Sequence, residues 1–337
     1  MQLSNRKNPG KRGLFIGLLA GCLFFLGQNP QERQPWEPGL SPAGDFKEGI
    51  RLRQEGRYVE AFEFFQEKLR QARTSENAGR KIFALIQLGD LLWNEGKLQD
   101  SEPYYYEASE IAGRNNLKEI REKTTNILDI FKYYKEGKKF RSAGDYEKSE
   151  KSFTKAIELS EKINSPDHKL KCLRQLSVTY WCSFDFTSFR KLNEEALALA
   201  RKLNHTREVG MCLNNLGIYH WKKNDYSRAL VYCHEALEIA RKLNNPSLES
   251  DCLNNIGVIY IELGILDKSH QFLNKALEIA LKLGNEHDVA SILVNLGRVS
   301  HLINRKYEDK NKFLKESLEH LERSLSISKK LDNKNIT

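Results

Sequence analysis

The stretch LNNLGIYHWKKNDYSRALVYCHEALEIA, from Leu213 to Ala240, decides the fold because close copies of it recur along the chain. With Gly217 as an anchor, the same pattern of apolar and small residues returns at six other positions: Gly49, Gly89, Gly137, Ser177, Gly257 and Gly297. Five of the six intervals between successive anchors are 40 residues long. A fixed period in this range indicates stacked supersecondary units. The sequence therefore predicts seven such units.

Each unit has the pattern of two helices joined by a tight turn. Seven residues after most anchors comes a residue that accepts the left-handed backbone ending a helix: Gly56, Gly96, Gly144, Asn224 and Gly264, with Phe184 as the exception. Nineteen residues after an anchor an alanine recurs in the second helix: Ala108, Ala156, Ala196, Ala236 and Ala276. Glycine in a helix interior costs about 1 kcal/mol relative to alanine. The anchors and alanines therefore indicate close approach of the two helices.

The pattern resembles the tetratricopeptide repeat, and its forty-residue period is similar to that of kinesin light chains and several bacterial regulators. The resemblance covers Ser41 to Leu331. It implies an all-α, right-handed superhelical solenoid of about seven helix pairs, whose first helices line a concave face. The sequence departs from the pattern at Phe189, where a small residue is usual, and at insertions near Arg114–Arg121 and Ile303–Lys310.

The first segment, residues 1–27, predicts an export signal. Four cationic residues precede the thirteen apolar residues Leu14–Leu26, a run shorter than the roughly 20 residues of a membrane span but typical of a signal-peptide core. Leu19-Ala20-Gly21-Cys22 resembles the lipobox of bacterial lipoproteins, which implies lipidation of Cys22. An ordinary signal peptide and an uncleaved anchor are the alternatives. We expect an exported protein, on the periplasmic or extracellular face, that meets the membrane only through this end.

Residues 28–42 hold four of the eight prolines, so they form a semi-extended tether before the array at 43–337. Free cysteines fit a reducing compartment better, so a cytoplasmic location is the alternative. The formal net charge is +9, but four cationic residues stand in the first twelve positions and lysine and glutamate alternate elsewhere. No basic stripe follows the chain, and we expect no nucleic-acid partner.

A polar row follows the first helices two residues before each anchor: Lys47, Gln87, Lys135, Gln175, Asn215, Asn255 and Asn295. At 100° per residue this row lies opposite the packed side of the helix. Amides both donate and accept hydrogen bonds, as an extended peptide requires. We predict that Gln175, Asn215, Asn255 and Asn295 line a partner-binding groove. The alternative is that the asparagines satisfy only neighbouring groups of the array.

Two further rows border this groove. One residue after the anchor stand Val178, Ile218 and Val258, and four residues after it stand Trp93, Trp181 and Trp221. Aliphatic and tryptophan side chains are typical of binding hot spots. The alternative for the tryptophans is a packing role between units.

The cysteines and histidines predict no chemical site. Cys172, Cys212 and Cys252 share the position five residues before the anchor, in helices too far apart for disulfides. We expect them to be small buried hydrophobes. No CxxC pair, histidine cluster, P-loop or GxSxG motif is present, so we expect no catalytic residue, metal or cofactor.

These patterns predict a non-catalytic scaffold that binds a protein or peptide. One alternative is a regulatory or sensory segment of a longer signalling protein whose effector domain lies beyond Thr337. A catalytic helical array is a more distant alternative. The last predicted helix has no polar cap, and repeat arrays normally have one; self-association through this C-terminal end is one way to cover it.

Overall fold

The computed structural model describes residues 44–54, 57–75, 77–306 and 310–336. The described residues form fourteen helices and no strand. The helices are α1 (Lys47–Gln54), α2 (Tyr58–Thr74), α3 (Ala78–Glu95), α4 (Leu98–Arg114), α5 (Lys118–Ser142), α6 (Tyr146–Lys162), α7 (Pro166–Cys182), α8 (Phe186–Lys202), α9 (Thr206–Lys222), α10 (Tyr226–Lys242), α11 (Pro246–Glu262), α12 (Leu266–Leu283), α13 (Glu286–Lys306) and α14 (Lys310–Ile336).

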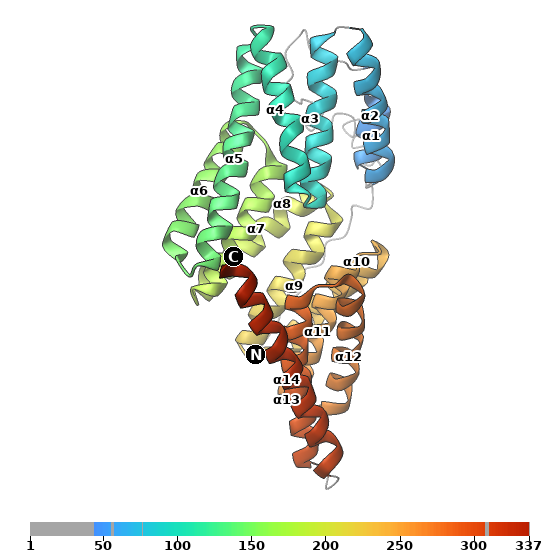
Figure 1. Ribbon diagram of the computed structural model, residues 1–337, viewed down its shortest axis with the longest axis vertical. Helices are drawn as coiled ribbons and strands as arrows, with labels where there is room; N and C mark the ends of the chain where they lie inside the picture. The colour runs from blue at the N-terminus through green and yellow to red at the C-terminus, as the bar shows by residue number, and fades with distance from the viewer. Residues whose placement is uncertain (1–43, 55–56, 76, 307–309, 337) are drawn as a thin grey trace, which may run out of the picture.

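Consecutive helices pack as seven antiparallel pairs; α1 to α6 lie side by side in the upper half of Figure 1, and the later pairs continue the array towards the lower end. The predicted all-α solenoid of seven helix pairs is thereby confirmed. The predicted export signal, with Cys22, and the predicted tether lie outside the described residues.

The anchor glycines are the points where the two helices of a unit approach most closely. A Cβ added at Gly89 would lie 2.6 Å from the Tyr105 ring, and one at Gly257 would lie 2.7 Å from Leu273 Cγ. Real Cβ atoms are not found so close to a neighbour. The fourth unit differs, because its anchor is Ser177 and its second helix carries the buried Phe189, which is 2% exposed.

Nearly every connection between helices contains one residue with a positive φ. Glycine or asparagine occupies all of these positions except one. The exception is Phe184, with φ 63° and 76% of its surface exposed. The turn positions predicted from the repeat are confirmed at Gly96, Gly144, Asn224 and Gly264.

The two insertions accompany lengthened first helices in the third and seventh units. Helix α5 has 25 residues, whereas α7, α9 and α11 have 17 each. Helix α13 has 21 residues. The superhelix is therefore irregular at the third and seventh units.

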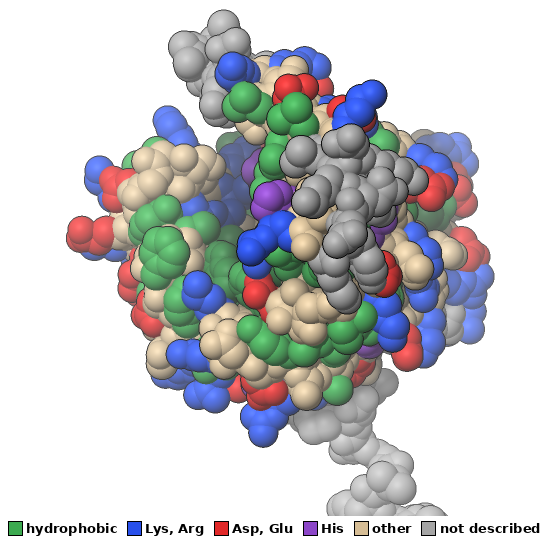
Figure 2. Space-filling model, turned by 90° about the horizontal axis from the view of Figure 1, so that it is seen from below, with side chains coloured by type: hydrophobic (Ala, Val, Ile, Leu, Met, Phe, Trp, Pro, Cys, Tyr) green, Lys and Arg blue, Asp and Glu red, His purple; other side chains and the backbone are tan. Residues whose placement is uncertain are grey.

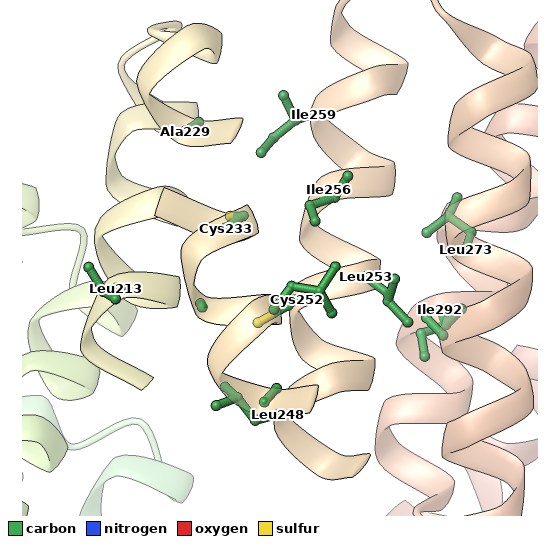
Figure 3. Packing of buried hydrophobic residues seen from close by; sticks show 14 of the residues in the cluster. Leu213, Ala229, Cys233, Leu248, Cys252, Leu253, Ile256, Ile259, Leu273 and Ile292 are labelled. Carbon is green, nitrogen blue, oxygen red and sulfur yellow. The ribbon is translucent and has the colours of Figure 1, made fainter. Parts of the chain in front are cut away.

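The hydrophobic core is divided into two large clusters. One cluster runs from Phe46 in the turn before α1 to Phe131 in α5, and the other runs from Leu170 in α7 to Ile303 in α13. A small third cluster, Ile130, Ala156 and Cys172, lies between them. Cys172, Cys212, Cys233 and Cys252 are fully buried, which confirms their predicted packing role; Figure 3 shows Cys233 and Cys252 among leucine and isoleucine side chains.

Candidate functional site

The asparagine row of α9, α11 and α13 forms a hydrogen-bonded ladder. Each asparagine donates from Nδ2 to the Oδ1 of an asparagine in the preceding unit. Asn255 reaches Asn214 at 3.0 Å, and Asn295 reaches Asn254 at 2.9 Å. Asn215 reaches Asn193 in α8 at 2.9 Å. The row is thus held in a fixed orientation by neighbouring units.

Asn215, Asn255 and Asn295 each contribute only one N–H of their side-chain amide to the ladder. Asn215, Asn255 and Asn295 are half-buried, and in the described part of the chain their Oδ1 atoms accept no hydrogen bond. A carboxamide carries two N–H donors and one carbonyl acceptor. Each asparagine therefore keeps one donor and one acceptor for another molecule. The two interpretations of this row, internal bonding and partner binding, are compatible.

The aliphatic row lies beside the asparagines. Val178, Ile218 and Val258 are half-buried in α7, α9 and α11. An ion pair of 3.1 Å between Arg298 and Glu262 joins α13 to α11. Apolar and basic side chains line a hollow when the molecule is viewed along its long axis (Figure 2).

One carboxyl group near this row has an unusual pKa. Asp251 stands one helical turn before Asn255 on α11. Burial, together with the charge of Asp288 on α13, raises the pKa of Asp251 to about 7. The protonation of this group therefore changes near neutral pH.

In the first half of the array, the glutamines of the polar row accept hydrogen bonds from arginine side chains. Arg141 donates to Gln175 Oε1 at 2.9 Å and to the Gln175 carbonyl oxygen at 3.0 Å, and Arg53 donates to Gln87 Oε1 at 3.0 Å. Gln175 is 9% exposed. The inclusion of Gln175 in the open groove is therefore wrong: its side chain is covered and already bonded.

The three tryptophans of the predicted groove lie in two different environments. Trp181 and Trp221 are half-buried, and the Trp181 ring lies 5.1 Å from those of Phe186 and Phe189. Trp93 is 2% exposed and stacks on His168. The prediction that Trp93 lines an open groove is wrong, because helices α5 and α7 cover it.

Sequence reasoning missed the residues that support the row. Arg53 and Arg141 stand four residues after their anchors, the register position held by Trp181 and Trp221 in later units. Alignment of the units by anchor shows arginine at this position in the first and third units and tryptophan in the second, fourth and fifth. Each arginine bonds the glutamine of the following unit.

Other kinds of site receive no support from the described residues. Within them, no group of three or more histidine, cysteine, aspartate or glutamate side chains is arranged to hold a metal ion. Across the same ranges, no helix has the length and apolar character needed to cross a membrane. A pocket between α2 and α4, lined in part by Phe62, Tyr104 and Glu107, lies away from the asparagine row.

Comparison with known proteins agrees with this geometry. One family model described as tetratricopeptide repeat matches residues 140–202 and 208–282, and a second with the same description matches residues 84–115. Together they match half of the chain. The chain is a tetratricopeptide repeat protein. No curated protein sequence matches this tetratricopeptide repeat protein.

Solved structures share its fold at low sequence identity. A Rap protein complexed with competence and sporulation factor is 14% identical, covers 86% of this chain and 96% of its own, and has a TM-score of 0.50. Aspartyl phosphate phosphatase F from Bacillus subtilis is 11% identical, covers 86% and 76%, and has a TM-score of 0.51. BtubC from P. vanneervenii is 18% identical, covers 83% and 92%, and has a TM-score of 0.45. These similarities concern the fold of the tetratricopeptide repeat protein alone.

Proposed function

We propose that this tetratricopeptide repeat protein is a non-catalytic scaffold that binds a protein segment along α9, α11 and α13. The observation that carries the proposal is the half-used asparagine ladder. Its free amide groups lie at equal steps along the array and match the alternating donors and acceptors of a peptide backbone. A pre-oriented amide also loses little side-chain freedom on binding.

The two rows have different roles in this proposal. A hydrogen bond that replaces one to water contributes a net of only about 0.5–1.5 kcal/mol. The asparagines therefore add little affinity, and their role is to set the register of the bound segment. Burial of Val178, Ile218 and Val258 supplies affinity, at roughly 25 cal/mol per Å² of apolar surface removed from water. We therefore expect a partner segment with apolar side chains and no strong charge requirement.

The test uses a peptide selected from a displayed random library against the wild-type protein. Replacing Asn215, Asn255 and Asn295 with alanine should weaken binding of that peptide at least tenfold in titration calorimetry, because about 1.4 kcal/mol corresponds to a factor of ten. Circular dichroism checks that helicity is kept.

The matched control replaces Asn214 and Asn254 with alanine. This change removes two of the same inter-unit hydrogen bonds but leaves Asn255 and Asn295 in place. The control should bind the peptide nearly as well as the wild type. Equal affinity of all three proteins would contradict the groove, and equal loss in both variants would show that the ladder acts only through stability.

We also propose export and membrane tethering through the N-terminal segment, with support from its sequence alone. The run Leu14–Leu26 and the lipobox-like Cys22 favour this location over the cytoplasm. The mass of the natively extracted protein tests it: a lipid adduct on Cys22 would support tethering, and an unmodified intact N-terminus would argue against it. A reading frame that continues past Thr337 would favour a regulatory segment of a longer signalling protein.

Self-association is a further candidate, favoured by exposed leucines on α14. One of them, Leu321, also packs against Gly297 of α13, where an added Cβ would lie 2.7 Å from Leu321 Cγ. Leu321 and Leu325 hold the register positions of Leu273 and Leu277 in α12, which are 0% and 8% exposed. In α14 the two leucines are 43% and 55% exposed, and Leu318 is 58% exposed. We propose that the α14 of a second copy covers this stripe, since a two-fold contact lets each copy cover the other.

The mass of the protein in solution tests self-association. Replacing Leu318 and Leu325 with glutamate should convert a dimer to a monomer in sedimentation equilibrium. The matched control is Val231→Glu on α10, which is also an exposed apolar position, at 65%. A monomeric wild type at all concentrations would overturn the proposal.

A further inference from the structure

A polar contact joins units that are not neighbours in the array. Lys171 Nζ in α7 donates to the Trp93 carbonyl oxygen, and Arg207 Nη1 in α9 donates to the Glu95 carbonyl oxygen at 3.3 Å. The rings of Trp93 and His168 stack with centroids 4.8 Å apart. We call these five residues the α3 clasp, because they hold the C-terminal end of α3 against α7 and α9 (Figure 1).

The electrostatics of the clasp follow from the geometry of a helix end. The last carbonyl groups of a helix carry a partial negative charge, which attracts cations. The Trp93 carbonyl oxygen accepts from Lys171 in addition to the Gly96 backbone N–H, which lies at 2.9 Å. Lys171 serves this end although it is only 6% exposed. Burial lowers the pKa of Lys171 to about 8, and the nearby Glu208 opposes that shift. Burial disfavours the charged form of Lys171, and the contact with the carbonyl end of α3 favours it.

Hydrogen bonding at the clasp is incomplete. Of the eight buried side-chain nitrogen and oxygen atoms without a hydrogen-bond partner among the described residues, four are in α3, α7 and α9 at this contact. They are Trp93 Nε1, Asn94 Oδ1, His168 Nε2 and Arg207 Nε. Unpaired buried polar groups are costly, and water would satisfy them if the contact opened. The closed arrangement therefore carries a penalty that opening removes.

The array can open at this point without unfolding a helix. In repeat arrays each unit is stabilised by its immediate neighbours, and the clasp skips the third unit. The two large hydrophobic clusters meet near the same unit, where only the small Ile130, Ala156 and Cys172 cluster separates them. A relative movement of the two halves about α5 and α6 would leave both large clusters intact.

We propose that the α3 clasp is a reversible latch that holds the first two units against units four and five. Its opening uncovers the part of Trp93 that His168 of α7 covers and, with it, the inner face of α3, while Phe131 and Tyr134 of α5 stay packed on the ring. The use of that face by a partner rests on the proposed scaffold function, whereas the opening itself does not. The latch accordingly determines how much of the inner face of α3 is accessible to solvent or to a partner.

The experiment removes the two cations that reach α3. In Lys171→Met with Arg207→Met, the radius of gyration from small-angle scattering should increase while helicity stays constant. Trp93 is then made the single tryptophan by Trp36→Phe, Trp181→Phe and Trp221→Phe, with Trp36 lying outside the described residues. Its quenching constant with acrylamide should rise severalfold in the latch variant compared with the same background carrying Lys171 and Arg207.

The matched control is Lys169→Met with Arg201→Met, which removes a lysine from α7 and an arginine from α8 that form ion pairs only with nearby helices. The control should keep the compact shape and the low quenching constant. If the double latch variant loses helicity, the single replacements are measured, and each should give a smaller increase in both readouts. Unchanged radius and quenching in helical latch variants would overturn the proposal, whatever the result of the peptide-binding test.

Discussion

At the scale of single residues, small side chains and buried titratable groups set the packing of this protein. Gly217 is an anchor whose added Cβ would meet the Cys233 sulfur and lie 3.3 Å from the Ala229 carbonyl oxygen. His168 is 1% exposed, with Nδ1 2.7 Å from the Ser165 hydroxyl and its other nitrogen unpaired. We expect both residues to affect stability through packing and protonation rather than through the proposed groove.

We predict that Gly217→Ala destabilises the protein by about 1–3 kcal/mol, because overpacking a tight helix contact costs that much. The free energy of unfolding in urea measures the change. Adding Cys233→Ala removes the sulfur that the new methyl group would meet, so the double variant should be less destabilised than the sum of its two single changes. Additive effects would show that the two positions are not in contact.

We predict that His168 lowers the stability of the protein as the pH falls from about 6.5 towards 4, an effect that the raised pKa of Asp251 opposes. Burial lowers the pKa of His168 to about 4, so between these values the unfolded chain binds a proton that the folded protein does not. A shift of this size corresponds to about 3 kcal/mol at most. Unfolding in urea across this pH range should show a smaller slope for His168→Phe, and an identical slope would contradict the assignment.

At the scale of helices and turns, the repeat is marked by left-handed residues between helices. Asparagine and glycine adopt this conformation readily, whereas a bulky side chain does so with strain. Phe184 joins α7 to α8 in this conformation and contributes little to packing because it is mostly exposed. The turn is therefore less stable than its counterparts.

We predict that Phe184→Asn stabilises the protein by about 0.5–1 kcal/mol, because it relieves backbone strain and loses little contact. Thermal unfolding should show the gain. Asn224→Phe places the same strain in the next turn and should lower stability by a similar amount. A loss of stability in Phe184→Asn would mean that the Phe184 ring makes a contact that outweighs the strain.

At the scale of the whole molecule, the divided core predicts unfolding in two steps. Leu88 belongs to the first large cluster and Leu253 to the second, and each is almost completely buried. Replacing either leucine with alanine should cost about 2–5 kcal/mol in one transition and leave the other nearly unchanged. Fluorescence of Trp93 and Trp221 in single-tryptophan backgrounds reports the two halves separately, and coincident shifts in both would contradict a divided core.

The repeat pattern was enough to predict the helix pairs, most turns, the close contacts at the anchors and the burial of the repeated cysteines. These features are local or involve neighbouring units, so the spacing of residues within one repeat is enough to place them. The asparagine row was also visible, because it follows the same register. Its partners Asn193, Asn214 and Asn254 were not, since side-chain pairing between units depends on the angle at which helices stack.

Only the tertiary structure placed Trp93 in the interior and brought α3 to α7 and α9. The rotation between successive units accumulates along a superhelix, so contacts between non-neighbouring units depend on the sum of several small angles. The lengthened α5 changes that sum at the third unit. No pattern within a single repeat contains this information, and for this reason the α3 clasp appears only in the folded array.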